Sequence, residues 1–204
     1  MTEERTEIVA DPAWGFPPDA KFYTLVEPTE GEKALYARSK WLPGPWHDEP
    51  MDQIVWTDPV TGLPCLMWRG FMGSWCGYVS VPEGHPAYGK DYHSVDANVH
   101  GGLTFAGTRE LPRFESAPTD WWLGFDCNHY MDLAPGMLSL EKEMLARDGD
   151  TGLWNRHKQY DPRTGAIRRG SELTEERYRD IHYVRAEVES LARQLKEMQV
   201  GATA

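Results

Sequence analysis

The chain has few cysteines, no long apolar run and a deficit of positive charge. Its three cysteines are an odd number and form no CxxC pair, which argues against a disulfide framework or a zinc ribbon. No stretch approaches the roughly 20 apolar residues that span a bilayer, so we expect no membrane partner. The formal net charge of -11 opposes attraction to phosphate backbones, and we therefore expect no nucleic acid polymer as a partner.

Several common signatures are also missing. The polar start, Met-Thr-Glu-Glu-Arg-Thr-Glu, lacks the apolar stretch of a secretory signal, which predicts a cytoplasmic protein. There is no GxGxxG or GxxxxGK[ST] loop and no Gly-x-Ser-x-Gly elbow, so a Rossmann site, a P-loop and serine catalysis are unsupported. The hydrophobic content of 40% and the length of 204 residues predict one folded domain over residues 1–204.

The order of segments predicts an α+β fold in which an antiparallel sheet is flanked by a few helices. Prolines in residues 1–28 indicate an extended N-terminal arm, and residues 53–168 form the sheet-rich core. Within that core, two DPxTG sequences at residues 58–62 and 161–165 predict hairpin turns. Further strands are expected at 75–81, 98–105 and 121–125, and shorter helices at 30–40 and 137–147.

A long amphipathic helix is expected at residues 173–199, with Thr174 as its N-cap. Apolar residues recur along it at spacings of three and four, namely Ile181, Val184, Val188, Leu191, Leu195 and Met198. This seam fits two structures: packing against the chain's own sheet, or self-association of the helix in a homo-oligomer.

The region from Cys65 to Gly136 is rich in residues that build pockets. It holds ten of the 19 glycines, four of the seven histidines and four of the nine tryptophans. The candidate ligand-binding residues are Trp75, His85, Tyr88, Lys90, His100, Gly101, Gly102, Thr104, Trp121 and Trp122. Aromatic side chains could stack on a base and the cations could meet phosphate, while bulges and turns without a ligand explain the glycines equally well.

Two loops extend this prediction. Residues 81–93 carry acid, base and cation together and are a candidate lid, or else a rigid surface turn. The basic segment 156–169, which includes Arg163 and Arg168, is either a solvated loop or one wall of an anion site.

Asp126, His129 and Asp132 form the strongest candidate metal cluster. One imidazole and two carboxylates suit several divalent ions, and His85 or His100 could complete the set. The alternative makes Asp126 a turn acceptor and His129 a hydrogen-bonded part of the fold. A divalent metal is therefore the one cofactor that the residues suggest.

Blocks at Gly77–Gly89, Val99–Phe105, Trp122–His129 and Tyr178–Val184 resemble a group of small uncharacterised proteins of tailed phages, prophages and bacteria. The resemblance spans roughly residues 40 to 198 and implies a cytosolic protein, in the bacterial host if phage-encoded. It carries no activity. We expect a protein that captures a small, nucleotide-like metabolite or host defence signal. A metal-dependent hydrolase and a structural or interaction protein are the alternatives.

Overall fold

The computed structural model describes residues 5–108, 120–149, 158–169 and 174–201. Its strands are β1 (Arg5–Ile8), β2 (Lys21–Leu25), β3 (Gln53–Thr57), β4 (Pro64–Arg69), β5 (Trp75–Val81), β6 (Phe105–Gly107), β7 (Trp121–Asp126), β8 (Lys158–Asp161), β9 (Ala166–Arg169) and β10 (Thr174–Arg177). Helices α1 (Pro135–Arg147) and α3 (Ile181–Gly201) accompany five short 3-10 helices, Pro12–Trp14, Glu32–Tyr36, Arg38–Lys40, Pro45–Asp48 and Tyr92–Ser94. The predicted α+β class is confirmed.

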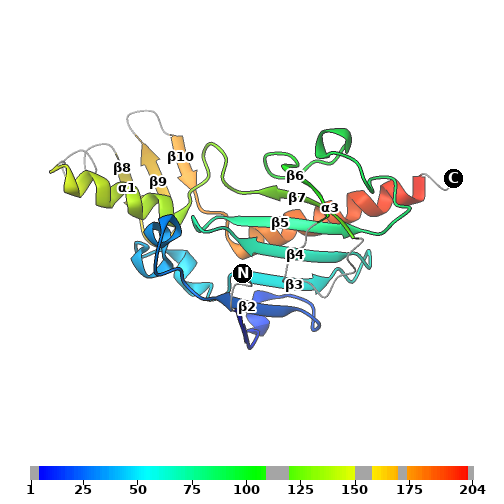
Figure 1. Cartoon of the computed structure of the whole chain (residues 1–204), viewed down its shortest axis with the longest axis horizontal. Coiled ribbons are helices and arrows are strands. Elements are labelled where there is room, and N and C mark those ends of the chain that lie inside the picture. Colours follow the sequence, from blue (N-terminus) through cyan, green and yellow to red (C-terminus); the bar gives the residue numbers. More distant parts are fainter. Residues whose placement is uncertain (1–4, 109–119, 150–157, 170–173, 202–204) are drawn as a thin grey trace.

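The strands form two antiparallel sheets. The larger has the order β1-β2-β3-β4-β5-β7-β6, and the smaller has the order β10-β9-β8. In Figure 1, α3 runs behind the large sheet, while α1 and the small sheet lie together at one end of the molecule. The site described below lies where the two sheets meet.

Both predicted hairpin turns are confirmed. Between β3 and β4, the Asp58 carboxylate accepts hydrogen bonds from the Thr61 amide and hydroxyl, at 2.8 and 2.7 Å. Gly62 then takes a φ of +73°, which favours glycine. In the second turn, between β8 and β9, the Asp161 carboxylate accepts from the Arg163 amide at 2.9 Å, and Gly165 has a φ of +61°.

Helix α3 covers one face of the large sheet. Ile181, Val184, Val188, Leu191 and Leu195 are all at most 2% exposed, and the helix packs on β5 and β4. A Cβ added to Gly77 of β5 would lie 2.5 Å from atoms of Val188 and Phe125, so the helix approaches the strand closely. The seam therefore packs against the chain's own sheet, the first of its two interpretations.

Three segments differ from the sequence expectation. Helix α3 begins at Ile181 rather than 173, because residues 174–177 pair with β9 as a strand. The side chain that caps its start is that of Asp180, which accepts from the Tyr183 amide at 2.8 Å. The arm at 1–28 contributes strands β1 and β2, since its prolines all fall outside them. The helix expected at 30–40 consists of two 3-10 helices.

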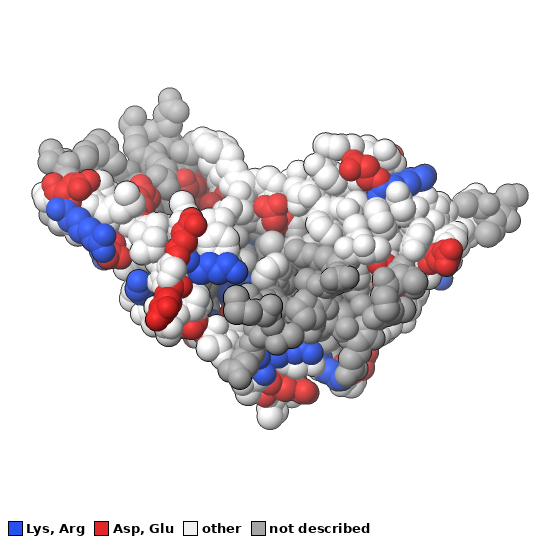
Figure 2. Space-filling view, in the orientation of Figure 1, with Lys and Arg blue, Asp and Glu red and all other residues white. Residues whose placement is uncertain are grey.

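No helix in the described ranges combines the length and apolar character needed to cross a bilayer. On the face in Figure 2, Lys and Arg side chains are interspersed with Asp and Glu rather than gathered in one continuous basic patch.

A buried ionic network joins the two sheets to α3. Glu49, which is 5% exposed, accepts from Arg69 at 2.7 Å and from the indole of Trp75 at 3.0 Å. Its carboxylate also accepts from the Tyr178 hydroxyl at 2.5 Å and from the Ile181 amide at 3.0 Å. Burial alone would lower the pKa of Arg69, but Tyr178, Glu49 and Asp52 outweigh it and keep the guanidinium charged.

Replacing Glu49 by alanine should strongly destabilise the fold. The substitution leaves the Arg69 charge buried without its main partner, a loss that typically costs about 3–5 kcal/mol. Urea unfolding of Glu49→Ala against the parent protein measures it, with Glu83→Ala, at an exposed loop position, as the control expected within about 0.5 kcal/mol. A loss below about 1 kcal/mol for Glu49→Ala would show that the network is not structurally important.

Candidate metal centre

His100, His129 and Asp132 meet at the end of β7. One ring nitrogen from each histidine and one carboxylate oxygen of Asp132 all lie within 4.8 Å of one another. The Nε2 of His100 is 2.7 Å from Oδ2 of Asp132, and the backbone amide of His129 donates to the same oxygen at 3.0 Å. The sequence predicts Asp126, His129 and Asp132 as ligands, with His85 or His100 as an addition. Of these residues, His100, His129 and Asp132 converge, whereas Asp126 lies 3.9 Å from Nδ1 of His129 and is not part of the group.

The loop that carries His129 and Asp132 is held at both ends. The Asn128 amide donates to Asp126 at 3.1 Å where β7 ends. Further along, Asp132 forms a parallel bridge with Arg177, in which the Arg177 amide donates to the Met131 carbonyl and the Leu133 amide donates to the Arg177 carbonyl, both at 2.9 Å. Between these anchors Met131 has a φ of +79°, a strained conformation for a non-glycine residue.

His100 lies on a turn rather than on the strand expected at 98–105. The Gly102 amide donates to the Val99 carbonyl, and Gly101 and Gly102 have φ values of +67° and +85°. Two consecutive residues of positive φ cannot continue a strand, so β6 begins only at Phe105. A Cβ on Gly101 would lie 2.3 to 2.6 Å from ring atoms of His129, so the ring occupies space that a side chain at position 101 would fill.

The first turn of α3 and the segment before it complete the cluster. Arg179 donates through Nε to Asp132 at 2.9 Å, and Tyr183 lies 2.9 Å from Nδ1 of His100. Burial alone would raise the pKa of Asp132, but hydrogen bonds from Arg179 and His100 outweigh it and lower the pKa. Asp132 is therefore ionised at neutral pH.

The geometry suits a metal ion. Bonds of about 2.0–2.2 Å place neighbouring ligand atoms roughly 3–3.5 Å apart, and the observed contacts of His100 and His129 with Asp132, 2.7 and 3.7 Å, bracket that range. In the described structure the Nδ1 atom of His129 is buried without a hydrogen-bond partner, 3.9 Å from Asp126. Burial raises the pKa of the Cys127 thiol, and Cys127 is not among the groups that converge in the cluster.

The other predicted ligand-binding residues do not join this cluster. His85 is buried and contacts the Leu195 carbonyl at 2.8 Å. His100 contacts Tyr183, which lies twelve residues earlier on α3, or roughly 18 Å along the helix axis. The Ala87 amide also donates to His85, so this part of the loop at 81–93 is fixed like a surface turn.

The aromatic candidates have mostly structural surroundings. Trp75 is 0% exposed in the core, and Trp122 is 1% exposed and packs with Leu66 and Tyr78 on the opposite face of the sheet. Trp121 and Tyr88 pack together, with ring centroids 6.0 Å apart, and the Trp121 indole donates to the Lys90 carbonyl. Lys90 lines a shallow hollow of about 490 Å³ beside the end of α3, and Thr104 is exposed.

Sequence reasoning missed Arg179, Tyr183 and Glu187 as members of the cluster. Glu187 accepts from the His100 amide at 2.8 Å. Arg179 and Tyr183 lie in the Tyr178–Val184 block, one of the blocks that carry the resemblance, but nothing in that block indicates contact with His100. A helix register alone could not show which distant loop these side chains meet.

Comparison with known proteins adds no family. The sequence matches no protein-family model and no curated protein, and no solved structure matches the chain. Functional inference therefore rests on the geometry of the cluster.

Gly101 and Gly102 offer a matched test of that geometry. Both have positive φ, so alanine at either position should lose about 1 kcal/mol of stability through backbone strain. Only Gly101→Ala should also displace the His129 ring, because a Cβ on Gly102 meets no atom within 4 Å. Urea unfolding and the NMR signal of the His129 ring measure the two effects. Equal shifts of that signal in both variants would contradict the contact.

Proposed function

We propose that the protein is a metal-dependent hydrolase whose divalent ion is held by His100, His129 and Asp132. The observation that carries the proposal is the buried, unpartnered Nδ1 of His129 beside the carboxylates of Asp126 and Asp132. An ion between these groups would satisfy that nitrogen. When bound, such an ion lowers the pKa of a coordinated water and so supplies a nucleophile near neutral pH.

The surrounding residues support the roles of the ligands. Tyr183 fixes the His100 ring from its far nitrogen, and Arg179 holds the second oxygen of Asp132, which leaves Oδ2 directed at the histidines. Metal-binding histidines and carboxylates are usually oriented by such partners. The side chain of His129 is 33% exposed, so the cluster is open to a substrate on that side.

Capture of a nucleotide without chemistry is less well supported. Base stacking by Trp75 or Trp122 would require side chains that are almost completely buried to become exposed.

A second candidate function is acid–base catalysis without a metal, because His100 contacts Asp132 directly at 2.7 Å in the arrangement of a general base and its orienting carboxylate.

The metal proposal predicts one bound divalent ion per chain after purification without chelators. His129→Ala should weaken the affinity of the protein for the ion by more than about 100-fold. Loss of a residue that only hydrogen-bonds to a metal ligand already costs up to that factor. Elemental analysis and calorimetry measure this, with His93→Ala, at an exposed position away from the cluster, as the matched control. A parent protein that binds zinc and manganese no better than His129→Ala would refute the metal centre.

Hydrolysis should depend on that ion. With p-nitrophenyl phosphate esters and p-nitrophenyl acetate as probes, we expect activity to disappear on treatment with EDTA and to return on addition of the ion. Activity that survives complete metal removal but is lost in Asp132→Asn would instead favour the metal-free alternative.

A further inference from the structure

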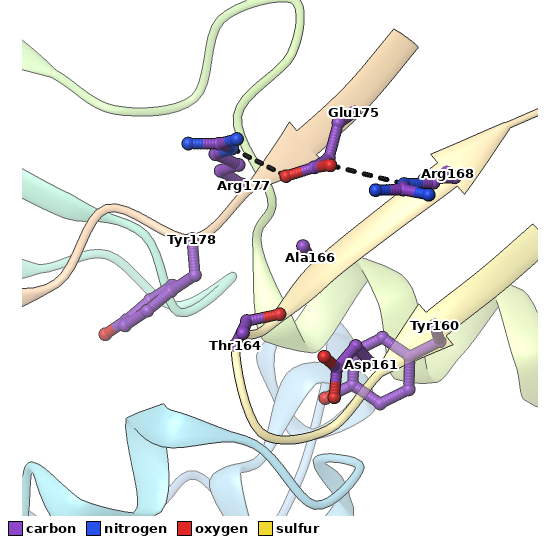
Figure 3. Close-up of a pocket in the computed structure, with 8 residues that line it drawn as sticks. All are labelled: Tyr160, Asp161, Thr164, Ala166, Arg168, Glu175, Arg177 and Tyr178. Atoms are coloured by element: carbon purple, nitrogen blue, oxygen red, sulfur yellow. Dashed lines mark hydrogen bonds and ion pairs between the residues drawn. The ribbon is translucent and has the colours of Figure 1, made fainter. Parts of the chain in front are cut away.

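A polar hollow lies beside the metal centre. It has a volume of about 630 Å³, within the usual range for small-molecule pockets. Its lining consists of Tyr160, Asp161, Thr164, Ala166, Arg168, Glu175, Arg177 and Tyr178. Figure 3 shows Arg168 and Arg177 joined through Glu175 on one side of the small Ala166, with Thr164, Asp161 and Tyr160 on the other.

The backbone connects this hollow to the metal cluster. Arg177 is the bridge partner of Asp132, so their backbones run side by side at about 4.8 Å, and paired residues direct their side chains to the same side. Within β10, Glu175 and Arg177 are two residues apart and share a face. Arg177 thus lines the hollow while Arg179, two residues later, bonds Asp132.

The charges of the hollow favour an anion. Glu175 accepts from Nε of Arg177 at 2.7 Å and from Nε of Arg168 at 3.3 Å, and these bonds lower its pKa. Asp161 pairs with Arg163, which does not line the hollow. Arg163 thus offsets the charge of Asp161 from outside the lining, and within the lining the guanidinium groups of Arg168 and Arg177 share one carboxylate, that of Glu175.

Both arginines keep donor groups for a ligand. In the described structure, each arginine donates to Glu175 through its Nε atom. The terminal nitrogen atoms are therefore the groups that can donate into the hollow. The two side chains are 58% and 64% exposed, and the shared glutamate fixes their spacing. Two guanidinium groups held in this way suit the several oxygens of a phosphate group.

We propose that this hollow is an anion subsite that binds the phosphate group of a small phosphorylated substrate, with Arg168 and Arg177 as its donors. The subsite would hold one end of the molecule while the cluster acts on another group. The binding of phosphate does not depend on the metal centre, but its role as a substrate subsite rests on the hydrolase function just proposed.

Inorganic phosphate is the direct probe. Titration of EDTA-treated protein by calorimetry or by NMR should give saturable binding, which Arg168→Gln and Arg177→Gln each weaken about tenfold or more. Arg193→Gln is the matched control, because Arg193 is an exposed arginine of α3 that lies outside the lining, and it should change the affinity less than about twofold. Thermal unfolding checks that all three variants remain folded.

The outcomes separate the two proposals. Absence of saturable phosphate binding to the parent protein, or an equal effect of Arg193→Gln, would overturn the subsite. If phosphate binds as expected and the protein hydrolyses phosphate esters, Arg177→Gln should raise KM about tenfold with little change in kcat. Phosphate binding in a protein that holds no metal and has no hydrolytic activity would retain the anion site and overturn its substrate role.

Discussion

Burial of the Glu49 carboxylate is the constraint on which the rest of the structure depends. An ionised carboxylate loses several kcal/mol of hydration on burial and must recover it from well-placed donors. Here the donors come from the end of β4, the start of β5, the residue after β10 and the first residue of α3. Because all four must converge on one group, the large sheet, the small sheet and the helix adopt a single relative arrangement.

That arrangement also determines the geometry of the candidate metal centre. Tyr178 and Ile181 both bond Glu49, and Arg179 lies between them in the sequence. The segment that is fixed from the core side therefore directs Arg179 outward to Asp132. The loop with the strained Met131 persists because its neighbours are held from both sides.

The sequence was informative where local chemistry decides structure. The two DPxTG turns need only an acceptor and a glycine, and the seam of α3 needs only its period, so both could be predicted. The prediction of a strand at 98–105 was wrong because paired glycines occur both in strands that approach another chain segment closely and in turns of positive φ. Thr174 and the two glutamates that follow it suit the start of a helix, whereas pairing with β9 makes residues 174–177 a strand. The meeting of His100 with Asp132 depends on contacts across 32 positions, which no local pattern encodes.

The order of the elements along the chain has a consequence for folding during synthesis. Helix α3 follows the strands it covers, so the apolar face formed by Val79, Leu123 and Phe125 has no helical cover until the last described element has emerged. Glu49 likewise lacks two of its donors, Tyr178 and Ile181, until more than a hundred further residues have been synthesised. Contacts of such long sequence separation form slowly and together, so the nascent chain should fold in one late, cooperative step rather than strand by strand.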